Sequence, residues 1–134
     1  FSVVIMKSLA TLDPDKGIDA MNAINKVILR TAFMPLFFVS SAMALLMVIT
    51  GIWFWGDPAA ARAVTGGLIY IFGMFVITAA ANVPLNNALA QVSSHSQEAI
   101  GIWDRYLVRW TRWNTTRAMA SVITLVICID LLTL

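Results

Sequence analysis

PLFFVSSAMALLMVITGIWFW, residues 35–55, is a run of 21 residues without a charged side chain. An α-helix rises about 1.5 Å per residue and the hydrocarbon core of a bilayer is about 30 Å thick, so the run is long enough to cross a membrane. Trp53 and Trp55 stand at its end, and tryptophan is typical of the boundary between lipid and water. The stretch predicts a transmembrane helix.

The composition of the whole chain supports an integral membrane protein. Its 134 residues are 60% hydrophobic and 12% charged, against roughly 25% charged residues in soluble domains. This length predicts one domain, residues 1–134, with room for about four crossings of some 20 residues each. A net charge of +2 and the lack of a DNA-binding motif argue against nucleic acid as a partner.

The inventory of metal-binding residue types is small. Cys128 is the single cysteine and His95 the single histidine, so no intrachain disulfide forms and a zinc or iron site lacks its usual ligands. We therefore expect no metal. Cys128 is interpreted as a packing residue.

The segment before the first apolar run divides into two parts. FSVVIMKSLATL, residues 1–12, gives roughly 18 Å of helix, which is too short to cross the bilayer. We interpret it as the inner half of a first crossing that is truncated at its N-terminus. Asp13 and Pro14 are typical of a helix N-cap and first turn, and they open a helix expected over about 14–31.

The helix expected over 14–31 is amphipathic. Its charged residues fall on one side and its large apolar residues on the other: Asp15, Asp19, Lys26 and Arg30 against Ile18, Met21, Ile24 and Ile28. Asn25 lies inside the apolar arc. Two interpretations stay open, a satisfied polar residue of an interfacial helix or a side chain that points into a shared polar site.

The next apolar run, residues 66–90, ends in AAANVPLNNALA. Pro84 lacks an N–H and clashes with the carbonyl four residues before it, which predicts a kink near residue 80. Asn82 and Asn86 share one face there. Their amides either knit the kinked crossing to a neighbouring helix or form the polar wall of a pocket between helices. Three glycines of the run favour close helix packing: Gly66, Gly67 and Gly73.

GIWDRYLVRWTRWNTTR, residues 101–117, has two different faces on a helix that Ser94 and Gln97 open with capping-box spacing. One face gathers aromatic and polar residues: Trp103, Tyr106, Trp110, Trp113, Asn114 and Arg117. The other carries Arg105, Arg109 and Arg112, which suit anionic lipid headgroups. We expect this helix to run from about 97 through 117 and to continue into the last crossing, roughly 118–134.

The distribution of Lys and Arg predicts the orientation. All but Arg62 lie on or near one face of the expected membrane, and the positive-inside rule places that face in the cytoplasm. The prediction is an all-α transmembrane four-helix bundle, with two amphipathic interfacial segments on the cytoplasmic side and both termini outside. Asp130 then lies either near the outer surface, which we favour, or against an intramembrane partner.

Four stretches carry a resemblance to a known family: FSVVIMKSLATL, GIDAMNAINKVILRTAFM, NVPLNNAL and WDRYLVRWTRWNTTR. They resemble the bacterial members of the anthrone oxygenase-like family of small integral membrane proteins, over nearly the whole chain. The resemblance implies a bundle of four transmembrane helices in a bacterial inner membrane and no familiar metal or flavin motif, hence no cofactor. Carried over, it points to Asn25, Asn82, Pro84, Asn86, Trp103, Tyr106, Trp110, Trp113, Asn114 and Arg117.

Fungal relatives in that family are associated with the oxidation of anthrones to anthraquinones, so the resemblance implies a cofactor-independent oxygenase. Arg117 and the amides of Asn82, Asn86 and Asn114 would hold an oxyanion, and the tryptophans would stack on a flat phenolic or quinone-like ligand. No base stands on that face, since His95 is expected in an exposed loop. The catalytic residues are therefore unassigned.

Two further classes of function remain open. The same residues suit a module that binds a hydrophobic small molecule without chemistry. Alternatively, the chain is a small accessory or scaffolding subunit of a larger membrane complex, with small residues in the third crossing making the contacts. A self-contained homo-oligomer would count against the scaffold.

Overall fold

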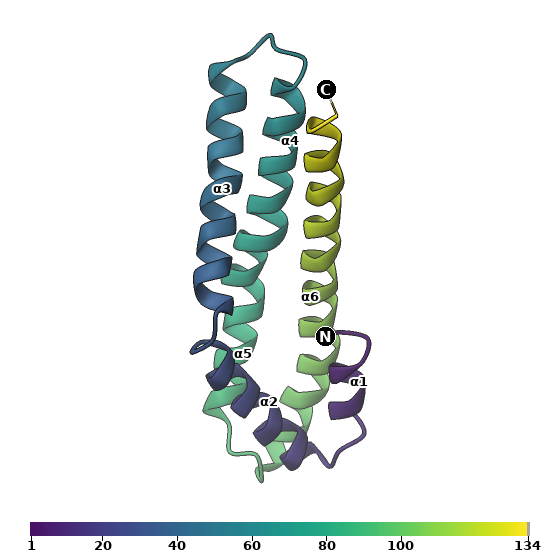
Figure 1. Ribbon diagram of the computed structural model, residues 1–134. Coiled ribbons are helices and arrows are strands. Elements are labelled where there is room, and N and C mark those ends of the chain that lie inside the picture. The colour runs from purple at the N-terminus through teal and green to yellow at the C-terminus, as the bar shows by residue number, and fades with distance from the viewer. Residues whose placement is uncertain (134) are drawn as a thin grey trace. The chain divides into compact units, whose positions relative to one another are not determined.

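The computed structural model describes residues 1–133, and every named element in that range is a helix (Figure 1). The α-helices are α1 (Ile5–Leu9), α2 (Pro14–Ile28), α3 (Phe33–Trp53), α4 (Ala60–Tyr70), α5 (Val83–Gln91) and α6 (Gln97–Leu131). Two π-helical segments, η1 (Ile71–Val76) and η2 (Thr78–Asn82), lie between α4 and α5. The predicted all-α class is confirmed.

Three helices are long and apolar enough to cross a membrane: Phe33–Trp53, Ala60–Gln91 and Gln97–Leu131. Their outer surfaces are strongly apolar, with Leu36 65% and Trp53 81% exposed, which suits contact with lipid rather than water. The chain is therefore compatible with a membrane protein. A fourth crossing, the bundle and the cytoplasmic position of the amphipathic segments remain predictions.

The expected continuation of the helix from Gln97 into the last crossing is confirmed, since both lie in one helix, α6. No proline stands between Gln97 and Leu131 to interrupt it. The first segment is shorter than expected. In residues 1–12 the described helix is α1, of five residues.

The described chain forms two compact units, each built from two stretches of sequence. Unit 1 consists of Phe1–Met34 and Ala79–Thr115, and unit 2 consists of Pro35–Thr78 and the chain from Thr116 onward. The prediction of a single domain is left open by this division. Each unit is described separately below.

The core of unit 1 joins α2 to α5 and the first part of α6. Ile18 and Met21 of α2, Leu89 of α5 and Tyr106 of α6 are all at most 1% exposed. A side chain at Gly17 would place its Cβ 2.7 Å from the Trp103 ring. Glycine therefore lets α2 approach α6, and the amphipathic pattern buries the expected face.

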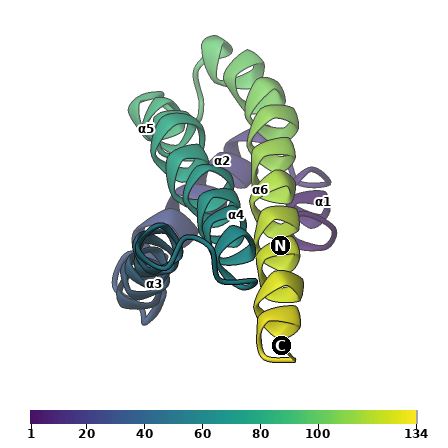
Figure 2. The ribbon, with the colours of Figure 1, turned by 90° about the horizontal axis from the view of Figure 1, so that it is seen from above.

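Unit 2 is packed through small residues. A Cβ at Gly67 would lie 2.6 Å from the Ala44 carbonyl oxygen of α3, and a Cβ at Gly73 would collide with Ala120 of α6. Figures 1 and 2 both show α3 beside α4. The predicted close packing at Gly66, Gly67 and Gly73 is confirmed.

The π-helical segments precede Pro84, the second residue of α5. A proline removes one backbone donor and crowds the carbonyl four residues earlier, and a wider π-turn is one way in which a helix accommodates such a disturbance. The structure thus shows a change of helix type just before Pro84, within the helical run Ala60–Gln91. The sequence predicted only a kink near residue 80.

Candidate functional site: a buried polar and aromatic cluster in unit 1

Three aromatic residues of α6 stack along one buried face. The ring centroids of Trp103 and Tyr106 are 5.7 Å apart, and those of Tyr106 and Trp110 are 5.9 Å apart, with interplanar angles of 13° and 20°. Spacings of three and four residues place them on the same side of the helix. All three are at most 6% exposed. Trp113, grouped with them by the sequence pattern, is 42% exposed and stands apart.

The Tyr106 hydroxyl connects α6 to two other helices. It donates a hydrogen bond to Asn86 Oδ1 of α5, at 2.8 Å, and the side chain of Asn25 from α2 lies close to it without reaching hydrogen-bond geometry. Nearby, Asn22 Nδ2 donates to the Leu89 carbonyl at 3.4 Å. Tyr106 is therefore the centre at which the amides of α2 and α5 meet.

Asn82 is the most deeply buried of the predicted asparagines, at 2% exposure. Its Nδ2 donates to the backbone carbonyl of Trp110, at a long 3.5 Å. This single long contact links the end of η2 to the aromatic face of α6.

Four buried polar atoms of unit 1 have no hydrogen-bond partner within residues 1–133. Two are acceptors and two are donors: Asn22 Oδ1, Asn82 Oδ1, Asn25 Nδ2 and Trp110 Nε1. A buried polar atom without a partner costs about 1–3 kcal/mol, so native proteins normally supply one from protein, water or ligand. All four atoms lie in unit 1. Their residues, together with Tyr106 and Asn86, form the polar–aromatic cluster. This cluster is the candidate site.

Asn22 was missed by the sequence reasoning. A signal was available, because Asn22 and Asn25 are three residues apart and therefore neighbours on the surface of α2. The helical periodicity placed Asn25 inside the arc of large apolar residues, and only Asn25 was predicted as a site residue of this helix.

Two predicted residues lie outside this cluster. Asn114 Nδ2 donates to Ser2 Oγ at 2.9 Å, within unit 1. Arg117 belongs to unit 2, where it is 8% exposed and its Nε contacts Met74 Sδ at 3.4 Å. The described ion pairs give Arg117 no acidic partner.

The other residues considered for function lie at the surface. Arg105, Arg109 and Arg112 are exposed on α6, and their binding of anionic headgroups stays a prediction. The exposed His95 has its Nδ1 3.6 Å from Asp15 Oδ2. Among the described residues, no group of three or more His, Cys, Asp or Glu side chains is arranged to hold a metal ion.

Comparison with known proteins identifies the family. The family model described as anthrone oxygenase matches residues 26–127, a range that includes all of the polar–aromatic cluster except Asn22 and Asn25. No curated protein and no solved structure matched the chain. Because the matched range covers most of the 134 residues, the chain belongs to the anthrone oxygenase family.

Proposed function

We propose that the polar–aromatic cluster binds a flat, hydrophobic phenolic or quinone-like molecule. The observation that carries this proposal is the set of four buried polar atoms without partners. Two acceptors suit a phenolic O–H, and two donors suit a quinone or ketone oxygen. A molecule that carries both groups on one aromatic frame offers partners to both kinds of atom.

The family description supplies a candidate of this chemistry. An anthrone is a flat tricyclic ketone, and its natural derivatives carry phenolic hydroxyls beside the carbonyl. The stacked rings of Trp103, Tyr106 and Trp110 offer a flat aromatic neighbour. We therefore propose an anthrone-like compound as the ligand class.

Oxidation of an anthrone to an anthraquinone consumes one O₂, places one oxygen atom on the methylene carbon and releases one water. The methylene carbon must first lose a proton, which leaves negative charge on the ketone oxygen. The unpartnered donors, Asn25 Nδ2 and Trp110 Nε1, are suited to stabilise that oxyanion before oxygen attacks. The titratable side chain next to the amides of Asn25 and Asn86 is Tyr106. Because a tyrosine hydroxyl is a weak base, the proposed proton loss relies on the acidity of the substrate's methylene carbon.

A ligand titration tests the proposal. The protein in lipid nanodiscs is titrated with 2,6-dihydroxyanthraquinone, a stable product analogue that carries ketone oxygens and phenolic hydroxyls, while quenching of tryptophan fluorescence is recorded. Saturable quenching is expected in the wild type and at least a tenfold weaker affinity in Asn25→Leu combined with Asn82→Leu. Asn87→Leu is the matched control, since Asn87 is an exposed asparagine of the same helix as Asn86.

Equal affinity in all three proteins would overturn the proposed site. Oxygen uptake with anthrone, measured above its spontaneous oxidation in empty nanodiscs, then separates catalysis from binding alone. An accessory subunit is the remaining alternative, and it predicts no saturable binding together with stable foreign chains in the purified protein.

A further inference from the structure

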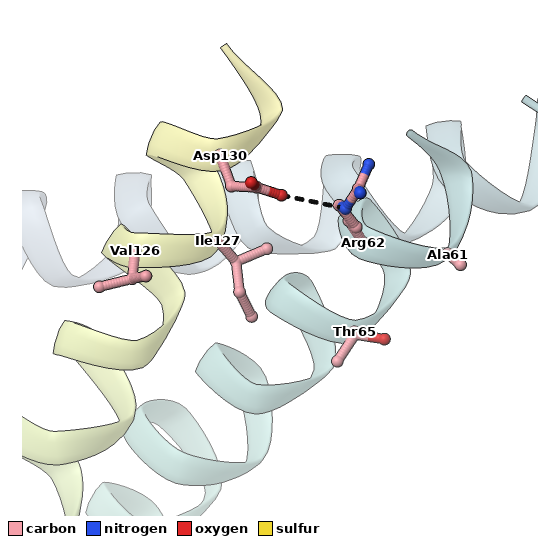
Figure 3. A pocket seen from close by; sticks show the side chains of 6 residues that line it. All are labelled: Ala61, Arg62, Thr65, Val126, Ile127 and Asp130. Carbon is pink, nitrogen blue, oxygen red and sulfur yellow. Dashed lines mark ion pairs between the residues drawn. The ribbon is translucent and has the colours of Figure 1, made fainter. Parts of the chain in front are cut away.

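A separate cavity of about 440 Å³ lies in unit 2, between the beginning of α4 and the end of α6 (Figure 3). Its volume falls in the range of sites that hold small molecules. Six residues line it: Ala61, Arg62, Thr65, Val126, Ile127 and Asp130. None of them belongs to the polar–aromatic cluster.

The lining changes from charged to apolar along the helices. Arg62 Nε and Asp130 Oδ2 form an ion pair at 3.0 Å, and Figure 3 shows these two side chains directed toward each other. Val126 lies one helical turn before Asp130, about 6 Å along the axis, and it is 59% exposed. A cavity with a polar end and an apolar wall suits an amphiphilic ligand.

The position of the ion pair within the chain agrees with this profile. Arg62 stands in the first turn of the candidate span Ala60–Gln91, and Asp130 in the last turn of Gln97–Leu131. Trp53 and Trp55, which are 81% and 70% exposed, stand just before α4 and are typical of the lipid–water boundary. The charged end of the cavity therefore belongs at the level of lipid headgroups.

Neither Arg62 nor Asp130 is stabilised by the dipole of its own helix. A cation near a helix N-terminus and an anion near a C-terminus both oppose the helix dipole, yet Arg62 and Asp130 occupy these ends of α4 and α6. Their side chains are 44% and 55% exposed, and an exposed pair of this kind stabilises a fold by only about 0–1 kcal/mol. Arg62 Nε and one carboxylate oxygen make this contact, and Arg62 Nη1 also donates to the Pro58 carbonyl at a long 3.5 Å. Arg62 Nη2 and the second carboxylate oxygen stay open to a second partner.

We propose that this cavity binds a phospholipid with an ethanolamine headgroup. Its phosphate accepts hydrogen bonds from the free part of the Arg62 guanidinium, and its primary ammonium donates to the Asp130 carboxylate. An acyl chain follows the wall made by Val126 and Ile127. Choline lacks an N–H to donate to Asp130, and glycerol lacks the positive charge, so ethanolamine is the headgroup that satisfies both residues.

Native mass spectrometry in mild detergent tests the proposal. The protein is offered an equimolar mixture of phosphatidylethanolamine, phosphatidylcholine and phosphatidylglycerol with identical acyl chains. The wild type is expected to retain phosphatidylethanolamine at least fivefold over either competitor. Asp130→Asn is expected to lower the retention of phosphatidylethanolamine to the level of phosphatidylcholine. Arg62→Gln is expected to weaken the retention of all three lipids.

Two further variants keep the result interpretable. Arg30→Gln removes an exposed arginine of unit 1 that is not assigned to lipid binding and is expected to leave the preference unchanged. Val126→Trp fills the apolar wall without altering a charge and is expected to lower retention about as much as Arg62→Gln, with helicity preserved in circular dichroism. A wild type without headgroup preference, a preference that survives in Asp130→Asn, or unchanged retention in Val126→Trp would overturn the proposal.

Discussion

At the scale of single residues, the buried asparagines divide into two kinds. Asn86 accepts a short hydrogen bond from the buried Tyr106 hydroxyl, whereas Asn82 makes one long bond and leaves its Oδ1 without a partner. Removing a satisfied partner strands the other group, but removing an unsatisfied group relieves a cost. The same substitution therefore has opposite consequences at the two positions.

This contrast gives a prediction for the ligand-free protein. Asn86→Leu should destabilise it by about 1–3 kcal/mol, because the Tyr106 hydroxyl loses its acceptor. Asn82→Leu should leave the stability unchanged or raise it. Thermal unfolding in detergent, followed by circular dichroism, compares the two. A loss at Asn82 as large as that at Asn86 would mean that Asn82 is structural rather than reserved for a ligand.

The Asp13–Lys16 pair permits a pH prediction outside the expected spans. A hydrogen bond from Lys16 at 2.7 Å, together with its charge, lowers the pKa of the Asp13 carboxyl from its usual 3.8. A folded-state pKa below the unfolded value means that the pair stabilises the start of α2 above about pH 4 and loses this effect as the pH falls through the lowered pKa.

Lys16→Gln should return the pKa of Asp13 toward 3.8, because both the hydrogen bond and the charge are lost. A carboxyl-carbon NMR titration measures it. An unchanged pKa would show that this exposed pair, with side chains 67% and 71% exposed, does not persist in solution.

At the scale of helices, close approach is set by glycines. The missing side chain of Gly17 leaves room for the Trp103 ring, while Gly101 on α6 has nothing within 4 Å of a built Cβ. The first is required by packing, whereas the second costs helix stability without a compensating contact. Substitution by alanine distinguishes the two.

Gly17→Ala should destabilise the protein by about 1–3 kcal/mol, because its Cβ would press on the Trp103 ring. Gly101→Ala should instead raise stability by up to about 1 kcal/mol. The midpoints of thermal unfolding check both. If Gly17→Ala were neutral, the packing of α2 against α6 described here would be wrong.

Much of the helix arrangement could be predicted from periodicity and length. The amphipathic pattern over 14–31 gave α2, and the uncharged run at 35–55 gave α3, displaced by two residues. The π-helical segments could not be predicted, because Pro84 signals a disturbance but not how the preceding turns absorb it. The continuity of α6 could be predicted, because no proline stands between residues 97 and 131 to break the helix.

At the scale of the whole molecule, the candidate site was predicted in part. Helical spacing brought Trp103, Tyr106 and Trp110 together and singled out Asn25, Asn82 and Asn86. It could not show that Trp113 is exposed or that Arg117 lies in unit 2, because helical spacing does not tell which elements pack against each face of a helix. The partner of Asp130 likewise depends on a contact between α4 and α6, which no local pattern records.

Family membership and the polar–aromatic cluster lead to one central claim, that the four unpartnered buried atoms receive an anthrone-like ligand. Ligand-dependent thermal unfolding in nanodiscs tests it most directly, because a ligand that binds the folded state at 100 times its Kd stabilises it by about 2.7 kcal/mol. We predict that 2,6-dihydroxyanthraquinone raises the melting temperature of the wild type and of Asn87→Leu. We predict no such rise for Asn25→Leu combined with Asn82→Leu. A rise of equal size in all three proteins, or in none, would contradict the account.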